Sequence, residues 1–305
     1  MIVTILGSGG GTGIPNPFCQ CPTCETARRY GGRDRRNAPA VLINDDLLID
    51  CGPDVINSAR QLGVSLASLQ ALVITHRHSD HLDPWFFRSR RSVKNTELPL
   101  LTVYGPRDAL DSVFDFYART FGWNRPMLEQ ETRTIWHPVE SGSRKLIGRY
   151  RLQFFPATHG NAMLQAVLVG VRDAQAGYFH CYDSGPLTEE AWTLLGDQRF
   201  DAAAIDATIG RQSDFSSAEH MTATQAIETA HRLREMGILA PEGYALATHF
   251  VHQDAGSHED KAAFYAPQGM TPAYDGLQLV LGEAAETPPV EIDSAEDWET
   301  SGLQE

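Results

Sequence analysis

The chain has 305 residues, of which 42% are hydrophobic and 21% charged, and this composition supports a folded core and excludes wholesale disorder. Its formal net charge of −14 argues against a general nucleic-acid binder that works by neutralising phosphates. No apolar run reaches the roughly 20 residues that a membrane-spanning helix needs, and no basic segment precedes an apolar one as in a signal peptide. We therefore expect a cytoplasmic protein that does not bind membranes.

Short apolar runs bounded by Gly, Pro or Asp predict strands, and helical periodicity lies between them. The predicted strands are Met1–Gly7, Ala40–Ile49, Leu72–Thr75, Leu101–Tyr104, Tyr150–Pro156, Met163–Val171, Gly177–Tyr182, Ala202–Asp206, Tyr244–Thr248 and Leu277–Leu281. The predicted helices are Asp54–Leu62, Asp108–Thr120, Glu189–Leu195 and Thr222–Met236. Because several strands follow one another directly, a regular doubly wound sheet fits poorly. The pattern predicts an α/β fold, an αββα sandwich of two packed mixed sheets flanked by helices.

Between Met1 and Leu281 no segment has the composition of an inter-domain linker, so one domain is expected over residues 1–283. Residues 284–305 contain seven acidic residues and no Lys or Arg. They also contain Pro288-Pro289 and few large apolar side chains. We interpret this stretch as an acidic C-terminal tail outside the core.

A dense group of metal-ligand residue types follows the apolar run 71–74: His76, His78, Asp80 and His81. Two residues apart on an extended chain, His76 and His78 point the same way and could bind one ion. Asp80 and His81 come after the next turn and could bind a second. Imidazole and carboxylate suit Zn, Mn, Fe or Ni rather than Ca. A polar surface loop is the alternative, but the chain has only 11 His, which argues against coincidence.

Three further polar residues each follow an apolar strand: His159, Asp183 and His249. Taken singly, each could cap a strand or lie in the core. A site for two ions needs more ligands than the histidine cluster offers, and these strand ends could supply them.

The motif His-x-His-x-Asp-His resembles that of the metallo-β-lactamase superfamily, and residues 76–81 match it in full. The resemblance implies two divalent transition-metal ions, Zn or Mn, and hydrolysis by a water or hydroxide between them. It also implies the ligands: His76, His78 and His159 for the first ion, Asp80, His81 and His249 for the second, and Asp183 bridging both.

Three cysteines fall within six residues, at Cys19, Cys21 and Cys24, in a chain with five. An odd number fits a disulfide framework poorly, and in a reducing compartment such a cluster more often holds a metal. A structural zinc site usually has four ligands. His252, three residues after His249, is the candidate fourth, and a partly occupied three-cysteine site or reactive thiols remain alternatives. The other two cysteines, Cys51 and Cys181, adjoin strands and are expected to be buried.

The glycine-rich opening 6–11, the Cys-x-Cys-x-x-Cys motif, the segment 104–106 and the late His-x-x-His-Gln resemble the PhnP-type cyclic phosphate phosphodiesterases, from Met1 to about Leu281. The resemblance implies a structural zinc on Cys19, Cys21, Cys24 and His252. It also implies that His220 lies beside the metals and protonates the leaving oxygen, the alternative being a helix-capping role. Asp50 and Asp206, which end strands, are expected to orient ligand histidines.

The expected function is hydrolysis of a small cyclic phosphate or nucleotide-like phosphodiester. Arg88, Arg90, Arg91 and Lys94 could recognise a phosphate, or form a solvated helix face. A tRNA 3′-processing nuclease is disfavoured by the negative charge and by the lack of a basic arm. An oxidoreductase or oxygenase resembling PqqB is disfavoured because that family characteristically lacks the intact histidine motif. The oligomeric state stays open, and a homodimer is compatible with the sequence.

Overall fold

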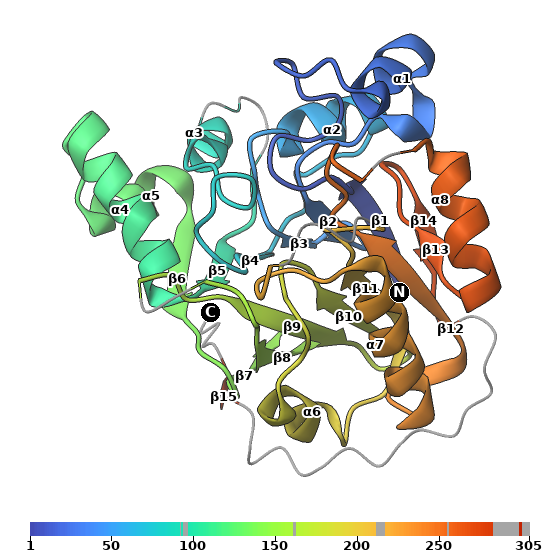
Figure 1. The fold of residues 1–305 in the computed structure, drawn as a ribbon. Coiled ribbons are helices and arrows are strands. Elements are labelled where there is room, and N and C mark those ends of the chain that lie inside the picture. Colours follow the sequence, from blue (N-terminus) through green and yellow to red (C-terminus); the bar gives the residue numbers. More distant parts are fainter. Residues whose placement is uncertain are drawn as a thin grey trace.

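Two mixed β-sheets lie face to face in the computed structural model, and helices cover the outer face of each (Figure 1). This confirms the predicted sandwich. The structure describes residues 1–91, 93, 97–160, 163–211, 217–254, 256–282 and 299–300. The predicted domain boundary near residue 283 and all but two residues of the acidic tail lie outside this range.

Within the described residues the first sheet has the order β14-β1-β2-β3-β4-β5-β6, and the strands from β3 to β6 run parallel. Its strands are β1 (Ile2–Gly7), β2 (Ala40–Ile43), β3 (Leu47–Ile49), β4 (Ala71–Val73), β5 (Leu101–Gly105), β6 (Thr134–Pro138) and β14 (Gln278–Val280).

The second sheet has the order β13-β12-β11-β10-β9-β8-β7-β15, with β10 to β13 parallel and β7 to β10 antiparallel. Its strands are β7 (Arg144–Ile147), β8 (Tyr150–Pro156), β9 (Val167–Arg172), β10 (Gly177–Cys181), β11 (Phe200–Asp206), β12 (Leu239–Thr248), β13 (Thr271–Pro272) and β15 (Glu299–Thr300).

The helices pack outside the two sheets. They are α1 (Pro22–Tyr30), α2 (Val55–Leu62), α3 (Trp85–Arg91), α4 (Arg107–Phe121), α5 (Arg125–Thr132), α6 (Glu189–Leu195), α7 (Ala223–Glu235) and α8 (His258–Tyr265), with short 3-10 turns η1 (Gly32–Asp34) and η2 (Ala266–Gln268). Helices α2 to α5 share an apolar cluster with the first sheet, and α6 to α8 with the second. No helix in the described ranges is both long and apolar enough to cross a bilayer.

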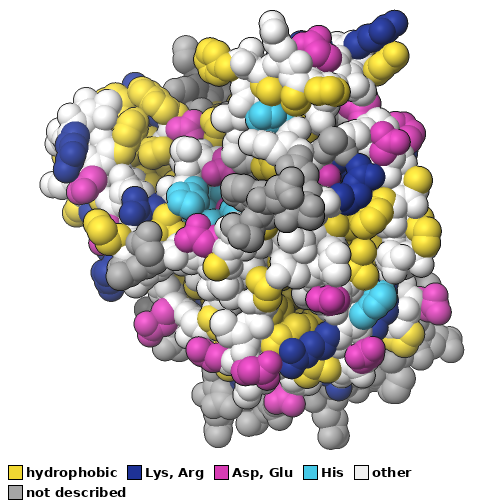
Figure 2. Space-filling view, in the orientation of Figure 1, with side chains coloured by type: hydrophobic (Ala, Val, Ile, Leu, Met, Phe, Trp, Pro, Cys, Tyr) yellow, Lys and Arg dark blue, Asp and Glu magenta, His cyan; other side chains and the backbone are white. Residues whose placement is uncertain are grey.

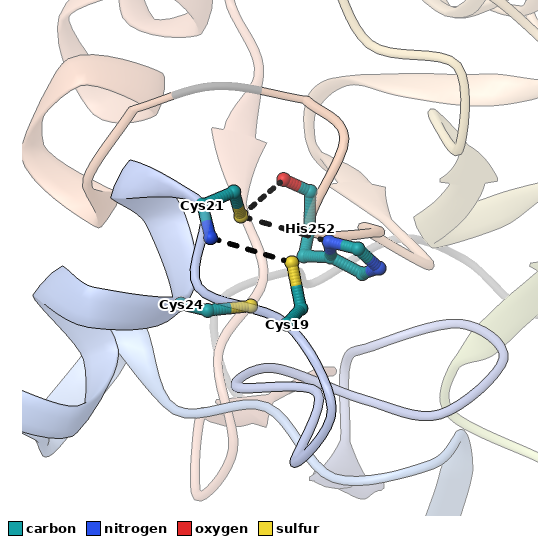
Figure 3. Close-up of side chains that lie close together, drawn as sticks. All are labelled: Cys19, Cys21, Cys24 and His252. Atoms are coloured by element: carbon teal, nitrogen blue, oxygen red, sulfur yellow. Dashed lines mark hydrogen bonds between the residues drawn. The ribbon is translucent and has the colours of Figure 1, made fainter.

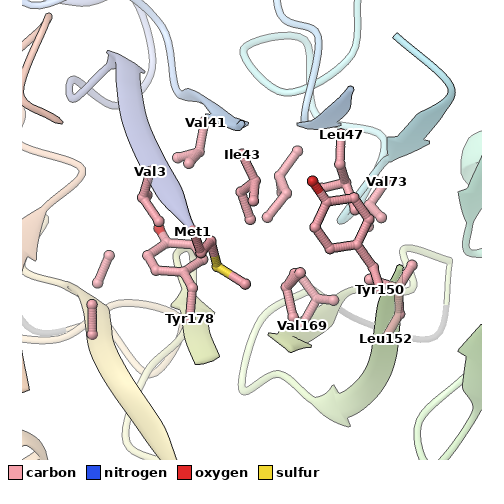
Figure 4. Packing of buried hydrophobic residues seen from close by; sticks show 14 of the residues in the cluster. Met1, Val3, Val41, Ile43, Leu47, Val73, Tyr150, Leu152, Val169 and Tyr178 are labelled. Atoms are coloured by element: carbon pink, nitrogen blue, oxygen red, sulfur yellow. The ribbon is translucent and has the colours of Figure 1, made fainter. Parts of the chain in front are cut away.

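The central core lies between the sheets and follows from strand alternation. Val3 and Ile5 of β1 face the same cluster as Leu152 and Phe154 of β8, and all four are fully buried (Figure 4). Since successive side chains of a strand point to opposite faces, the residues between them face the outer helices. Two buried faces per strand explain the continuous apolar runs in the sequence.

The topology brings the carboxyl ends of several strands to one edge. Strands β10, β11 and β12 are parallel neighbours, so Asp183, Asp206 and His249, which end or follow them, meet at that edge. His76 follows β4 of the other sheet, and His159 follows β8. The candidate site therefore lies where the ends of the two sheets meet.

Some elements differ from the sequence prediction. The predicted strand Ala40–Ile49 is two antiparallel strands, because the chain turns at Asn44–Asp46 and Asn44 has a φ of 50°. The predicted strand Met163–Val171 begins only at Val167. The capping box of Thr222 and Gln225 is confirmed at the start of α7. Helices α1, α5 and α8 and strands β6, β7, β13 and β15 were not predicted.

Candidate metal centre

The first group of candidate ligands joins three histidines and one carboxylate from both sheets. Single ligand atoms of His76, His78, His159 and Asp183 all lie within 4.8 Å of one another. His159 Nε2 is 3.1 Å from His78 Nδ1, and His76 Nε2 is 3.2 Å from Asp183 Oδ2. His76 is fully buried, whereas His78 is exposed, so the group opens to solvent at His78. Figure 2 shows histidine and acidic side chains together at the surface of this face, left of centre.

The second group shares Asp183 with the first. Ligand atoms of Asp80, His81, His249 and Asp183 also lie within 4.8 Å of one another. His81 Nε2 is 2.9 Å from Asp183 Oδ2, the same oxygen that lies near His76. Asp80 Oδ2 is 3.5 Å from His81 Nε2 and 3.6 Å from His249 Nε2. The structure thus brings together all seven residues that the sequence singled out for this centre.

The residues fit metal ions by their chemistry and by their surroundings. His76 Nε2 is buried, and although it lies 3.2 Å from Asp183 Oδ2, the two atoms do not have hydrogen-bond geometry, an arrangement that native structures rarely leave uncompensated. Burial lowers the pKa of His76 to about 4, which keeps the ring neutral and available as a ligand. Imidazole nitrogens and carboxylate oxygens suit a divalent transition metal.

The carboxylates of the second group make it attractive to cations. Burial opposes a charge on His249, but Asp183, Asp80 and Asp206 outweigh it and raise the pKa of this histidine to about 10. For Asp80 the balance also favours the charged form, because His81 and His249 outweigh burial and hold the pKa of this carboxyl below its usual range. A cluster that draws protons onto its histidines also favours a bound cation.

Further hydrogen-bond partners orient two of the candidate ligand histidines. The pair His81 Nδ1 and Asp50 Oδ2 are 2.7 Å apart, and Asp50 also accepts hydrogen bonds from the backbone N–H and hydroxyl of Thr75. His249 Nδ1 is 2.8 Å from the hydroxyl of Thr208, which donates to Asp206. Such partners set which ring nitrogen faces the metal. Asp50 and Asp206 occupy the places expected from the sequence.

Backbone strain concentrates in the same place. Asp50, Asp183 and His249 have φ values of 62°, 45° and 61°, in the left-handed region that residues other than Gly rarely adopt. Each such residue costs of order 1 kcal/mol or more, and the surrounding structure must impose it. Three of them at one edge of the sandwich mark a functional site rather than ordinary strand ends.

His220 lies at the rim of both groups. Its Nδ1 is 3.1 Å from Asp206 Oδ2 and 3.5 Å from Asp183 Oδ1, and its ring centre is 5.1 Å from that of His159. Burial opposes protonation, but Asp206 and Asp183 outweigh it and raise the pKa of His220. The side chain is 21% exposed, so the ring is accessible from solvent.

The three cysteines and His252 meet away from this centre, with their ligand atoms within 4.8 Å of one another (Figure 3). Cys21 Sγ lies 3.6 Å from His252 Nδ1. Burial raises the pKa of Cys21, but hydrogen bonds from Cys24, His252 and Cys19 outweigh it and lower the value to about 6. A thiolate is the form that binds metal. Three thiols and one imidazole suit a closed structural zinc site.

The remaining cysteines, Cys51 and Cys181, are fully buried, as expected.

The arginines that follow the histidine motif make contacts within the protein. Arg90 is buried and donates to the carbonyls of Thr132 and Pro99. Arg91 pairs with Glu131 of α5, and Arg88 stacks over Phe121 and Trp123. These contacts give all three arginines a structural role, and Lys94 lies outside the described residues.

Segments of the chain are similar to curated proteins of different activities. A stretch of 115 residues is 36% identical to an octanoyltransferase of Porphyromonas gingivalis, covering 36% of this chain and 22% of that protein. Another of 107 residues is 35% identical to a ribonuclease Z of Mycolicibacterium gilvum, covering 34% of this chain and 32% of that protein. The chain spans less than a third of the length of these two relatives.

Solved structures resemble the chain over nearly its full length. A diphosphatase from the PhnP family matches with a TM-score of 0.70 and 22% identity, covering 92% of this chain and 97% of that one. Zn²⁺-bound PqqB from Methylobacterium extorquens matches with a TM-score of 0.65 and 17% identity, covering 92% of this chain and 100% of that one. At these identities the likeness is one of fold.

Residues 46–250 match the family model of the beta-lactamase superfamily domain. This span runs from the turn before β3 to the residue after His249, so it contains both histidine groups, while the cysteine cluster lies before it and His252 after it. With two mixed sheets, flanking helices and His/Asp groups that could hold metal ions at the strand ends, the chain belongs to the metallo-β-lactamase superfamily and has its hydrolase fold.

Proposed function

We propose that this protein is a binuclear metal-dependent phosphodiesterase that cleaves a small cyclic phosphate or a nucleotide-like phosphodiester. The observation that carries the proposal is the position of Asp183 Oδ2, which lies 3.2 Å from His76 Nε2 and 2.9 Å from His81 Nε2. One carboxylate between two sets of three further ligands suits a pair of neighbouring ions. When bound, two such ions supply an acidified water and neutralise charge on a phosphoryl oxygen.

The ligand residues divide into two sets. His76, His78 and His159 would hold the first ion, and Asp80, His81 and His249 the second. Asp50 and the hydroxyl of Thr208 keep the rings of His81 and His249 turned so that Nε2 of each faces the second position. Because these partners are themselves buried, the ligands need little rearrangement on binding.

His220 is the proton donor in this proposal. Asp206 accepts from Nδ1, which fixes the ring, and raises the pKa of His220, which favours its protonated form. An alkoxide leaving group departs poorly unless it is protonated, and a positioned acid contributes about 100-fold or more. Nε2 of His220, which Asp206 leaves open, would donate that proton.

We further propose that Cys19, Cys21, Cys24 and His252 hold one structural zinc. All five cysteines are free thiols, which a reducing compartment such as the cytoplasm maintains. His252 lies three residues after the ligand His249, so the zinc would stabilise the segment that leaves β12. The catalytic and structural sites are then connected through one short stretch of chain.

A tRNA-processing ribonuclease is the second candidate, favoured by the 35% identity of one segment to a ribonuclease Z. Net charge opposes it, because the chain has 25 Lys and Arg against 39 Asp and Glu and so has no surplus of cations with which to bind RNA phosphates. A third candidate, an oxidoreductase like PqqB, has support from the fold and from a segment of 128 residues that is 31% identical to a coenzyme PQQ synthesis protein B of Methylobacterium radiotolerans.

The test is a comparison of substrates with protein loaded with Zn²⁺ or Mn²⁺. We expect hydrolysis of bis(p-nitrophenyl) phosphate and of a five-membered cyclic phosphodiester, and no cleavage of a precursor tRNA at its 3′ end. The control is Asp80→Ala, which removes a ligand and leaves the core strands intact. Cleavage of the tRNA without turnover of the small diesters would replace the proposal by the ribonuclease.

A further inference from the structure

The glycine-rich segment Ser8–Gly11 touches two ligands of the second group. The backbone N–H of Gly11 donates to Asp80 Oδ2 at 2.9 Å. Gly10 lies so close to His249 that a Cβ on it would be 2.5 Å from the imidazole Cε1. Only glycine leaves room for the ring at that position. The segment therefore holds one ligand by a hydrogen bond and limits the position of another by contact.

The same segment is paired with the backbone of the ligand strand. Phe250 N–H donates to the carbonyl of Ser8 at 3.1 Å, and Gly10 N–H donates to the carbonyl of Phe250 at 3.0 Å. Phe250 directly follows His249 and is fully buried. A displacement of Ser8–Gly11 would therefore move the backbone next to His249.

A single carboxylate, that of Asp275, anchors the start of this segment. Asp275 Oδ1 accepts hydrogen bonds from the backbone N–H of Ser8 at 2.9 Å and from its hydroxyl at 2.8 Å. Its other oxygen accepts from the backbone N–H of Asn37 at 2.7 Å. Burial raises the pKa of Asp275 to about 6, so the carboxyl is ionised at neutral pH and uses both oxygens as acceptors.

A buried arginine completes the anchor. Arg36 is 3% exposed, donates to the Ser8 hydroxyl at 2.9 Å and lies over the ring of Phe250 at 4.6 Å from its centre. The Ser8 hydroxyl thus accepts from Arg36 and donates to Asp275. This arrangement fixes Ser8 from two sides and joins it to the residue after His249.

We propose that Asp275 is a positioning residue for the second metal site: through Ser8 it holds the Gly10–Gly11 backbone against His249 and Asp80. The inference rests on the proposed binuclear function. It assigns a role to a residue 26 positions after His249 that contacts neither ligand itself.

The test compares Asp275→Asn with wild type. An amide of the same shape offers one acceptor oxygen where three donors converge. We therefore expect the affinity of the second metal site (Asp80, His81 and His249) for Mn²⁺ or Co²⁺ to fall about tenfold or more. The visible absorption of Co²⁺ at this site should change, and binding at the other metal sites should stay as in wild type. Ser8→Ala, which removes only the hydroxyl, should give a smaller loss in the same equivalent.

The control is Asp173→Asn. Asp173 also accepts two backbone N–H groups in a turn, from Gln175 and Ala176, but lies between β9 and β10. It should retain wild-type affinity at every equivalent. Equal weakening of all equivalents by Asp275→Asn, together with a lower melting temperature of the metal-free protein, would assign Asp275 a general structural role and overturn the proposal.

Hydrogen exchange separates this inference from the proposed function. In metal-free Asp275→Asn we expect faster exchange than in wild type in peptides that contain Gly10 and Gly11. Unchanged exchange and unchanged affinity would overturn the positioning role even if the wild type is a binuclear phosphodiesterase. If the wild type binds a single ion at the histidine centre, the binuclear function fails, and the exchange result alone decides the positioning role.

Discussion

Asp50 Oδ2 lies 2.7 Å from Nδ1 of His81, a member of the second group of candidate ligands, and both side chains are fully buried. The same carboxylate accepts from the backbone N–H and hydroxyl of Thr75, one residue before His76. Asp50 therefore connects both ends of the histidine motif, and its own φ of 62° shows that the fold holds it there at a cost.

Asp50→Asn should weaken the binding of the second metal ion more than that of the first. The amide has one acceptor oxygen where the carboxylate meets His81 Nδ1 and both donors of Thr75, and partners of this kind are worth about 10–100-fold in metal affinity. Titration of the metal-free variant with Mn²⁺ measures the effect. Wild-type affinity for both ions would show that Asp50 does not orient His81.

His220→Ala should separate substrates by their leaving groups. Esters with alkoxide-like leaving groups need a proton from His220, and we expect their kcat/KM to fall about 100-fold or more. p-Nitrophenolate leaves without a proton donor, so the kcat/KM for esters of p-nitrophenol should fall far less. Equal losses on both substrates would assign His220 a structural or binding role.

Cys21→Ser should destabilise the protein and remove one metal equivalent. Structural zinc contributes about 10 kcal/mol or more in small zinc peptides, and we expect a smaller loss here because the chain has its own core. Metal analysis and thermal unfolding measure the two effects. The matched variant is Cys181→Ser, which alters a buried thiol outside the cluster and should keep the wild-type metal count. An unchanged metal count and melting temperature in Cys21→Ser would exclude the zinc site.

Low pH should destabilise the metal-free protein through His180. This ring is fully buried against Tyr182, and burial lowers its pKa to about 3, below the unfolded value of about 6.5. The unfolded chain therefore takes up the proton first, so the stability from neutral His180 is complete above pH 6.5 and is lost as pH falls toward 3.

Urea unfolding of the metal-free protein at pH 4.5 and 6.5 measures this effect. His180→Phe keeps the stacking on Tyr182 and removes the titrating group. The pH dependence of its unfolding free energy should be smaller than that of wild type by about 1.4 kcal/mol per pH unit in this window. Identical slopes for the two proteins would show that His180 does not contribute.

The sequence was sufficient to single out the candidate ligands, because His159, Asp183 and His249 each follow an apolar strand and the resemblance to the metallo-β-lactamase motif groups them with residues 76–81. Asp183 and His249 come directly after the runs that became β10 and β12, and parallel pairing through β11 brings them together. The motif from His76 to His81 is local and needs no knowledge of the fold. The two sheets followed from the number of strands that succeed one another without a helix between them.

Contacts between distant segments could not be predicted in this way. Ser8 and Asp275 are separated by 267 positions, and neither lies in a motif with known chemistry. The glycines after Ser8 indicate a turn or a close approach, but the identity of the approaching group, the His249 ring, depends on the tertiary structure.

Two short helices were interpreted incompletely from the sequence. Helix α3 begins directly after the metal-binding loop, and its arginines look like a solvated face, although Arg90 is buried against the carbonyls of Thr132 and Pro99. For α8, by contrast, the signal was present, because Ser257 and Asp260 form a capping box that marks its start.

The central claim is that two ions held by the histidine centre perform phosphodiester hydrolysis. The most direct measurement adds metal stepwise to metal-free wild type, Asp80→Ala and His81→Ala, and records bound equivalents and turnover of bis(p-nitrophenyl) phosphate together. We predict three equivalents per wild-type chain, with activity that requires both ions of the histidine centre, and in each variant one equivalent fewer, no turnover and an intact fold by circular dichroism. Full turnover in both variants, or none in fully loaded wild type, would contradict the account.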